Sequence, residues 1–277
     1  MTPYPLELRR VSLSFDSVNV LNGANLKLAR GTVTGLLGRN GSGKTTLMRV
    51  ALGLMHADDG GASVFGTPSI DSPSEIRKRI GYVPQSFDSF SWMKVNDCIE
   101  FVASFYKDDW DSSLIERLIK EWQLSDKKIG ELSSGDQQKV SILLAIGHTP
   151  ELLILDEPVA KLDPAARRDF LRILVEMNID HDQTILLSSH ITSDIERICT
   201  HIAILHEGRI VCDSEINALK QNVRVVTVPG SVFPTGINVL GGHGNQRYVW
   251  YTDDVDLPTD ALVEETTLED FIIGITA

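Results

Sequence analysis

Gly38-Arg39-Asn40-Gly41-Ser42-Gly43-Lys44-Thr45-Thr46 is the stretch that decides the fold. It follows a short apolar run at residues 33–37 and opens onto residues 47–52, whose composition is typical of a helix. In the order strand, glycine-rich loop, helix, the pattern G-x-x-x-x-G-K-[ST] indicates a phosphate-binding loop. Its glycines let backbone N–H groups face phosphate oxygens, and the helix N-terminus adds the positive end of its dipole. The stretch therefore predicts a nucleotide site.

Two side chains of this loop have separate expected roles. Lys44 bridges the β- and γ-phosphates, and the Thr45 hydroxyl completes the shell of a Mg²⁺ ion that otherwise keeps water and phosphate ligands. A chance match would occur in on the order of 1% of chains of this length, and the strand–helix context lowers that further. The loop residues assigned to nucleotide binding are Gly38, Asn40, Gly41, Ser42, Gly43, Lys44, Thr45 and Thr46.

Composition limits the class of protein. The 277 residues suffice for one large domain and a small appendage, and a hydrophobic fraction of 42% is ordinary for a globular protein with a buried core. A net charge of -12 argues against nucleic-acid binding, which needs a basic stripe. Cys98, Cys199 and Cys212 form no C-x-x-C pair, so we expect three buried thiols. No apolar run reaches the roughly 18 residues of a membrane span, and we expect a cytoplasmic protein.

The first half of the chain predicts strands followed by helices. Residues 6–28 alternate apolar and polar positions, which predicts antiparallel strands with a break near Asn22-Gly23. Residues 80–83 predict another strand, followed by Pro84-Gln85. From residue 95 to about 147 the composition is helical, so we expect a helical subdomain of about residues 86–148 inserted into an α/β core.

The second half returns to alternating strands and helices. Four apolar residues at 152–155 are typical of a parallel strand that is covered on both faces. Residues 222–277 alternate and are rich in Pro, Gly and Asn, which predicts a small β-rich appendage that ends in a helix at 268–275. The predicted fold is α/β: a P-loop ATPase core in residues 1–221, with an antiparallel β subdomain and a helical subdomain, plus a C-terminal appendage.

Asp156-Glu157 directly follows the apolar strand at 152–155. An Asp at the carboxyl end of a strand beside the phosphate loop can hold Mg²⁺ through water. The adjacent Glu157 can then orient or deprotonate a water near the γ-phosphate. Taken alone, an acidic pair after a strand is a weak signal; downstream of a phosphate loop it predicts a hydrolytic site.

Two further segments point to a family. Residues 132–140, Leu-Ser-Ser-Gly-Asp-Gln-Gln-Lys-Val, resemble the LSGGQ signature of ABC ATPases, and Leu187-Ser188-Ser189-His190 resembles their switch-histidine motif. With Gln85, and with Leu162-Asp163 six residues after Asp156, the order and spacing resemble the nucleotide-binding domain of an ABC transporter across residues 1 to about 220.

The resemblance implies roles for individual side chains. Phe15 would stack on adenine, although its position also suits a core phenylalanine. Gln85 would touch Mg²⁺ or the attacking water, Glu157 would be the general base, and His190 would contact the γ-phosphate. The residues that the resemblance implies as catalytic are Glu157, His190, Gln85 and Lys44, and those near Mg²⁺ are Thr45, Gln85 and Asp156.

The signature is expected to act on a second subunit. Ser133 and the Gly135 N–H, at a helix N-terminus, would cap the γ-phosphate held by another copy, so the resemblance implies a head-to-tail dimer around two ATP molecules. The family usually has Gly where this chain has Ser134, commonly Gln at Asp136, and a small residue at Lys161. These departures lie on surfaces that would meet the other subunit.

The resemblance implies an ATPase subunit that works with a separate transmembrane permease and lies on the cytoplasmic face of the membrane through it. Export is preferred over import because residues 265–271 resemble the tail of exporter ATPases. One alternative is a non-transport ABC ATPase acting on DNA or ribosomes; against it stand the single cassette, the lack of a long heptad run and the net charge of -12. Another is an ATP-binding regulatory subunit with weak turnover, suggested by Ser134, Asp136 and Lys161.

Overall fold

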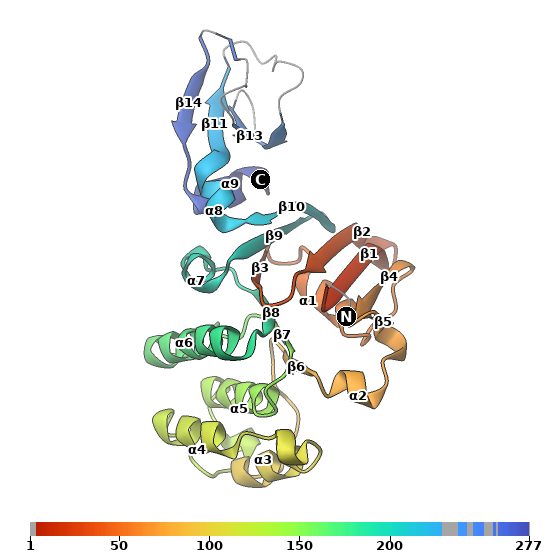
Figure 1. Cartoon of the computed structure of the whole chain (residues 1–277), viewed down its shortest axis with the longest axis vertical. Coiled ribbons are helices and arrows are strands. Elements are labelled where there is room, and N and C mark those ends of the chain that lie inside the picture. The colour runs from red at the N-terminus through yellow and green to blue at the C-terminus, as the bar shows by residue number, and fades with distance from the viewer. Residues whose placement is uncertain (1–3, 229–237, 243–245, 252–256, 259, 277) are drawn as a thin grey trace.

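The structure is a computed structural model that describes residues 4–228, 238–242, 246–251, 257–258 and 260–276, without the side chains of residues 180 and 181. A six-stranded sheet lies at the centre of the molecule (Figure 1). An antiparallel sheet flanks it, a group of helices lies at one end, and a second antiparallel sheet lies at the other end. The predicted α/β class, with its antiparallel, helical and C-terminal β-rich parts, is confirmed.

The central sheet is parallel except at one edge, where its last strand runs antiparallel. Three inner strands are buried along their whole length, which explains why they are nearly all apolar. The carboxyl ends of parallel strands meet at one edge, so the loops that follow them converge there. In spatial order the strands are β10 (Arg209–Glu215), β9 (His201–His206), β3 (Val33–Leu37), β8 (Thr184–Ser188), β7 (Leu152–Leu155) and β6 (Ile80–Val83).

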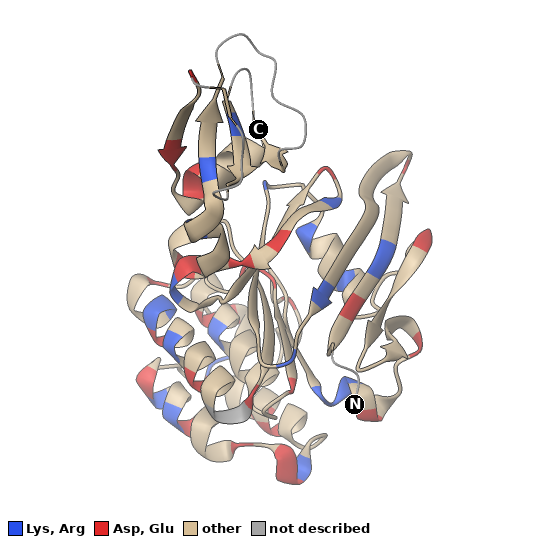
Figure 2. Cartoon of the chain, turned by 45° about the horizontal axis from the view of Figure 1, so that its top comes forward, with Lys and Arg blue, Asp and Glu red and all other residues tan. Residues whose placement is uncertain are grey.

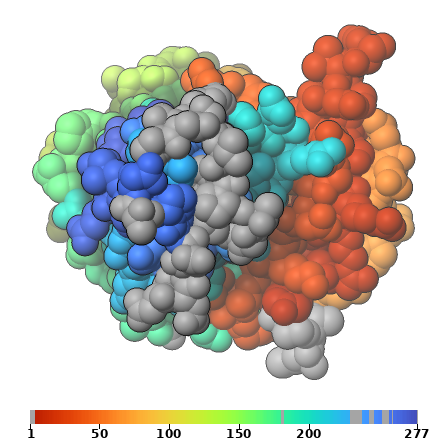
Figure 3. All heavy atoms as spheres, turned by 90° about the horizontal axis from the view of Figure 1, so that it is seen from above, coloured from red at the N-terminus to blue at the C-terminus, as the bar shows by residue number. Residues whose placement is uncertain are grey.

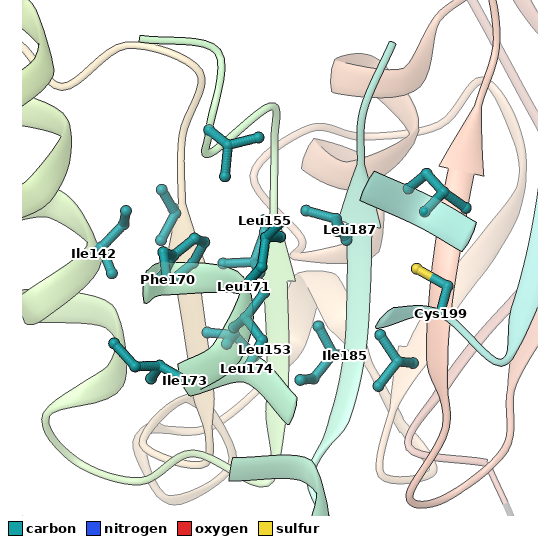
Figure 4. Packing of buried hydrophobic residues seen from close by; sticks show 14 of the residues in the cluster. Ile142, Leu153, Leu155, Phe170, Leu171, Ile173, Leu174, Ile185, Leu187 and Cys199 are labelled. Atoms are coloured by element: carbon teal, nitrogen blue, oxygen red, sulfur yellow. The ribbon is translucent and has the colours of Figure 1, made fainter. Parts of the chain in front are cut away.

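Helices cover the central sheet. Those of the main body are α1 (Lys44–Ala51), α5 (Ser134–Ile146), α6 (Pro164–His181) and α7 (Thr192–Ile198). Phe170 and Leu174 of α6 pack on leucines and isoleucines of β7 and β8 (Figure 4). Pro164 stands at the first position of α6, where a missing N–H costs nothing, and Asp163 caps that helix. Outside this set lie α2 (Ser74–Arg77), α3 (Val95–Ala103) and α4 (Ser112–Glu121), with short 3-10 turns at Ser69–Asp71, Lys107–Asp109 and Ile129–Glu131.

The antiparallel sheet corrects one sequence-based expectation. Its strands, in spatial order, are β2 (Val18–Leu28), β1 (Leu6–Phe15), β4 (Asp59–Val64) and β5 (Thr67–Pro68). The turn between the first two lies at Asp16-Ser17, and β2 continues through Asn22-Gly23. The predicted break at that pair is therefore wrong. Gly23 adopts a φ of 69° inside the strand, and the Asn22 N–H donates to the Gly208 carbonyl at 2.8 Å, so a tertiary contact replaces a turn.

The C-terminal region is a second antiparallel sheet packed on two helices. Its strands, in spatial order, are β12 (Val239–Gly241), β13 (Gln246–Trp250), β11 (Val223–Thr227) and β14 (Leu262–Glu265), and its helices are α8 (Ile216–Asn222) and α9 (Leu268–Ile275). Phe271 of α9 is buried in the same apolar cluster as Leu219 of α8 and the α5 and α6 side chains. Seen from above, this region lies beside β1 and β2 rather than over them (Figure 3).

The charged residues are spread over the fold, and the three cysteines are buried. Lys and Arg are interspersed with Asp and Glu over the helices and sheets drawn in Figure 2. Cys98, Cys199 and Cys212 are free and buried, as expected, and burial raises the pKa of the Cys98 thiol to about 11. Within the described ranges, no helix has the length and apolar character needed to cross a membrane.

His148, just after α5, links stability to pH. Its ring stacks on Tyr106 with 4.0 Å between centroids, and its Nε2 lies 3.2 Å from the Ile80 carbonyl oxygen, which fits a neutral ring that donates from Nε2. Burial lowers the pKa of His148 to about 4. The unfolded chain, with an ordinary histidine pKa of about 6.5, therefore binds the proton first as pH falls.

Stability held by a neutral His148 should thus be complete above pH 6.5 and be lost as pH falls toward 4. At pH 5 the loss is expected to be about 2 kcal/mol relative to pH 7. The measurement is urea unfolding of the parental chain and of His148→Gln at both pH values. The parental chain should lose about 2 kcal/mol more than the variant; equal losses would contradict the assignment.

Candidate nucleotide site

The glycines of the loop after β3 are required by close backbone contacts. A Cβ on Gly38 would lie 2.4 Å from the Leu205 carbonyl oxygen, and one on Gly43, whose φ is 102°, would lie 2.9 Å from the Val20 carbonyl oxygen. Gly43 is the N-cap of α1, and among the described residues no side chain caps that helix. The N–H groups of its first turn therefore have no intrahelical partner and can bind an anion.

Lys44 is held inside this loop. Its Nζ donates to the carbonyl oxygens of Gly38 at 2.8 Å and Arg39 at 3.3 Å. Burial lowers the pKa of Lys44, while the charges of Glu157 and Asp156 oppose that shift. A buried ammonium next to free N–H groups is matched by a phosphate, whose oxygens accept from both. The Ser42 hydroxyl oxygen is also buried and has no hydrogen-bond partner within the described part of the chain.

A cleft of about 460 Å³ opens over the loop. It brings together residues from six separate parts of the sequence, including the end of β1 and the second residue after each of β6, β7 and β8. Phe15 is 44% exposed at the end of β1 and lines the cleft, so of the two sequence-based alternatives the structure favours an exposed ring over a core one. The lining residues are Phe15, Val20, Asn40, Gly41, Gly43, Lys44, Thr45, Thr46, Gln85, Glu157 and His190.

Nearly all of these lining residues are predicted from the sequence. Val20 is the exception: it is an ordinary residue of β2 that reaches the cleft because β2 packs against the loop. No sequence signal would have identified it. Gly38, Ser42 and Asp156 lie beneath the lining rather than in it, since Gly38 and Asp156 contact neighbouring strands and the Ser42 hydroxyl is buried.

Asp156 and Glu157 follow β7 and occupy different environments. Asp156 is 1% exposed; its Oδ1 accepts from the Ser188 hydroxyl at 2.9 Å, and no described residue bonds to its buried Oδ2. Glu157 has a φ of 48°, which is unusual for a residue other than glycine, and faces the cleft. The His190 Nδ1 lies 3.4 Å from the Glu157 Oε2. A carboxylate thus stands beside the phosphate loop, with an imidazole next to it.

The site fits Mg²⁺ held mainly by nucleotide and water. The orphaned Asp156 Oδ2 is a buried anionic oxygen that needs a partner, and Thr45 and Gln85 add oxygens at the cleft. In the described ranges no three His, Cys, Asp or Glu side chains cluster as a metal cage. Mg²⁺ keeps several waters and takes phosphate oxygens, so a sparse set of protein ligands suits it.

The signature residues lie outside the cleft. Ser133 is the exposed N-cap of α5, accepting from the Asp136 N–H at 3.2 Å, and Gly135 is in the first turn. A Cβ on Gly135 would lie 2.8 Å from the Lys161 carbonyl oxygen, so the signature packs against the segment before Asp163. The predicted helix N-terminus is confirmed, and within one subunit these two residues do not line the nucleotide cleft.

The comparisons with known proteins agree on one family. The sequence profile of the family described as ABC transporter matches residues 21–160. The bacitracin transport ATP-binding protein BcrA of Enterococcus faecalis is 31% identical over 81% of this chain and 73% of its own length.

Solved structures resemble the fold. The structure of an ATP-binding subunit of an ABC transporter has a TM-score of 0.70 and 30% identity, covering 78% of this chain and 92% of that chain. The ATP-binding cassette MJ0796, in a dimeric post-hydrolysis state bound to ADP and Pi, has a TM-score of 0.67 and 20% identity, covering 76% of this chain and 98% of that chain. The second likeness shows the fold alone.

Proposed function

The chain belongs to the ABC transporter family as an ATP-binding and ATP-hydrolysing subunit, and we propose that it powers export through a separate transmembrane permease. The observation that carries the proposal is the cleft in which the phosphate loop, Glu157 and His190 face the same space. Transport is favoured because BcrA, a bacitracin transport protein by name, aligns with most of this chain and most of its own length. Export is favoured because residues 265–271 resemble the exporter tail. The substrate would be selected by the permease.

We propose the following roles for the cleft residues. Phe15 stacks on adenine, while Lys44 exchanges its two backbone carbonyl partners for the β- and γ-phosphates. Glu157 is the general base for the attacking water, and His190, beside it, contacts the γ-phosphate. Mg²⁺, when bound by Thr45, Gln85 and Asp156, would neutralise charge on the phosphates. The phosphate-binding set also includes Gly38, Asn40, Gly41, Ser42, Gly43 and Thr46.

A head-to-tail dimer would complete the site. Ser133 and Gly135 stand at an exposed helix N-terminus outside the cleft of their own subunit, so they can reach a γ-phosphate only on a second copy. Two such contacts related by symmetry enclose two ATP molecules. Loss of the γ-phosphate on hydrolysis would open the dimer and move the permease.

We propose three functional parts. Residues 1–221 form the ATP-binding domain, residues 86–148 its helical subdomain and residues 222–277 an accessory region. The helical subdomain exposes Trp92, Phe101 and Phe105, and Phe90 packs edge-on against Phe101 with ring centroids 5.9 Å apart. Exposed aromatic side chains of this kind are typical of a protein interface, and we assign them to the permease.

Membrane fractionation tests the transport assignment against an activity on DNA or ribosomes. A tagged full-length chain is expressed in its source cells, and membranes are solubilised in mild detergent. We expect a multi-span membrane protein to co-purify and to be lost with Trp92→Ser, a change at an exposed position outside the nucleotide cleft. Recovery with ribosomes or DNA, without a membrane protein, would overturn the transport assignment.

Asp136 is the strongest local departure from the family's signature. Its Oδ2 accepts from the Ser133 hydroxyl at 2.9 Å, and its Oδ1 accepts from Lys139 at 3.0 Å. The carboxylate thus binds groups of its own helix, in the first turn, where it favours the positive end of the dipole.

We expect Asp136→Gln to destabilise the subunit by about 0.3–1 kcal/mol. ATP-driven association should stay intact or improve, because a nearby negative charge is removed. Thermal melting and association at two ionic strengths test this. A large gain in association that shrinks with salt, without a lower melting temperature, would mean that Asp136 faces the nucleotide directly.

A further inference from the structure

Ser188 is a polar residue at the end of an otherwise apolar part of β8, and it is completely buried. A buried hydroxyl is costly unless it is hydrogen-bonded. Its hydroxyl donates one hydrogen bond and accepts one, and both are made with the two acidic residues of the nucleotide site. It donates to the Asp156 Oδ1 at 2.9 Å and accepts from the Glu157 backbone N–H at 2.8 Å.

This contact follows from the register of the sheet. Leu155 of β7 pairs with Leu187 of β8, so the next residue of each strand lies at the same level of the carboxyl edge. Only a short side chain with both a donor and an acceptor can bridge the Asp156 carboxylate and the following amide at that point. Serine meets this requirement, whereas alanine or valine would leave the amide and Oδ1 without partners.

The two bonds fix different features of the site. The bond to Oδ1 occupies one carboxylate oxygen of Asp156 and leaves Oδ2 as the oxygen without a partner. The bond from the Glu157 N–H holds a residue whose φ of 48° is otherwise disfavoured, and that residue's Oε2 lies beside His190. We propose that Ser188 is a positioning residue that sets the orientation of Asp156 toward Mg²⁺ and of Glu157 toward the attacking water. The inference rests on the function proposed above.

The test compares three variants of the full-length chain. Ser188→Ala removes both bonds, and Ser188→Thr keeps the hydroxyl. Thr184→Val is the matched control: it lies in the same strand, is fully buried, and removes a hydroxyl that accepts the Gly31 N–H at 3.0 Å, at the end of β8 away from the nucleotide. Readouts are ATP affinity in EDTA and in Mg²⁺, the kcat and KM of ATP hydrolysis, and the melting temperature.

We expect Ser188→Ala to lower kcat by about 10-fold or more with a smaller change in KM. It should weaken ATP binding in Mg²⁺ while leaving binding in EDTA unchanged. Ser188→Thr should keep kcat and the ATP affinity in Mg²⁺ near the parental values. Thr184→Val should lower the melting temperature without changing kcat or the ATP affinity in Mg²⁺. If Ser188→Ala matches Thr184→Val in all readouts, the inference is overturned.

Failure of the proposed function would give a different result from failure of the Ser188 inference. In that case the parental chain would itself show no ATP binding, or no gain in ATP affinity on adding Mg²⁺. A parental chain that binds ATP with Mg²⁺ but turns it over slowly still tests the inference, because the difference between binding in EDTA and in Mg²⁺ does not depend on hydrolysis.

Discussion

Glu157→Gln is expected to lower ATP turnover by about 10³-fold, within the range typical for loss of a general base, and to leave ATP affinity within a few-fold of the parental value. The amide keeps the shape of a side chain that is mostly buried beside His190, but it cannot take a proton from water. The backbone bond to Ser188 is unaffected, so the fold around the site is preserved. Phosphate release and displacement of a fluorescent nucleotide measure the two quantities.

Lys44→Ala provides the contrast. It removes the buried ammonium from the loop and should weaken ATP binding itself, because the remaining N–H groups alone must hold the phosphates. Hydrolysis by Glu157→Gln at the parental rate would show that another group, or water alone, acts as base. Equal loss of binding in both variants would mean that Glu157 supports the loop rather than the chemistry.

Parts of the fold that depend on neighbouring residues were predictable from the sequence, whereas parts that depend on contacts with distant residues were not. The turn into α1 was predictable because Gly41 and Gly43 need positive φ and the helix starts at once. The break at Asn22-Gly23 was not, because the same pair is a turn signal when its N–H groups are free and a strand irregularity when Gly208 accepts one of them. That distinction depends on a segment nearly 190 residues away.

The site residues that follow strands of the central sheet were predictable from the sequence. Glu157 was predicted from its place after a buried strand, and Gln85 and His190 from the family resemblance; all three follow strands whose carboxyl ends meet at one edge. The contacts of Val20 and Ser188 were not predictable, because they depend on the register of neighbouring strands. Sequence patterns identify residues that face a ligand more readily than residues that hold them in place.

The Glu157→Gln chain should be monomeric with ADP and become a dimer when ATP is added. The exposed N-terminus of α5, with Ser133 and Gly135, needs a γ-phosphate to bind, and ADP lacks it. Slow turnover keeps ATP in place long enough for the dimer to accumulate. Light scattering at saturating nucleotide measures the mass, which should double. A monomer under these conditions would contradict a self-sufficient homodimer and indicate that the permease is needed for assembly.

Mixing two variants tests whether the signature acts on the other subunit. Ser133→Asp places a carboxylate where the γ-phosphate of the partner would lie, and Lys44→Ala cannot hold ATP. Each variant alone should hydrolyse ATP at less than about a tenth of the parental rate. A mixed dimer has one complete site, made by the loop of the Ser133→Asp subunit and the signature of the Lys44→Ala subunit, so mixing should restore hydrolysis. If mixing gave only the average of the two separate rates, Ser133 would have to act within its own subunit, which its position outside the cleft opposes.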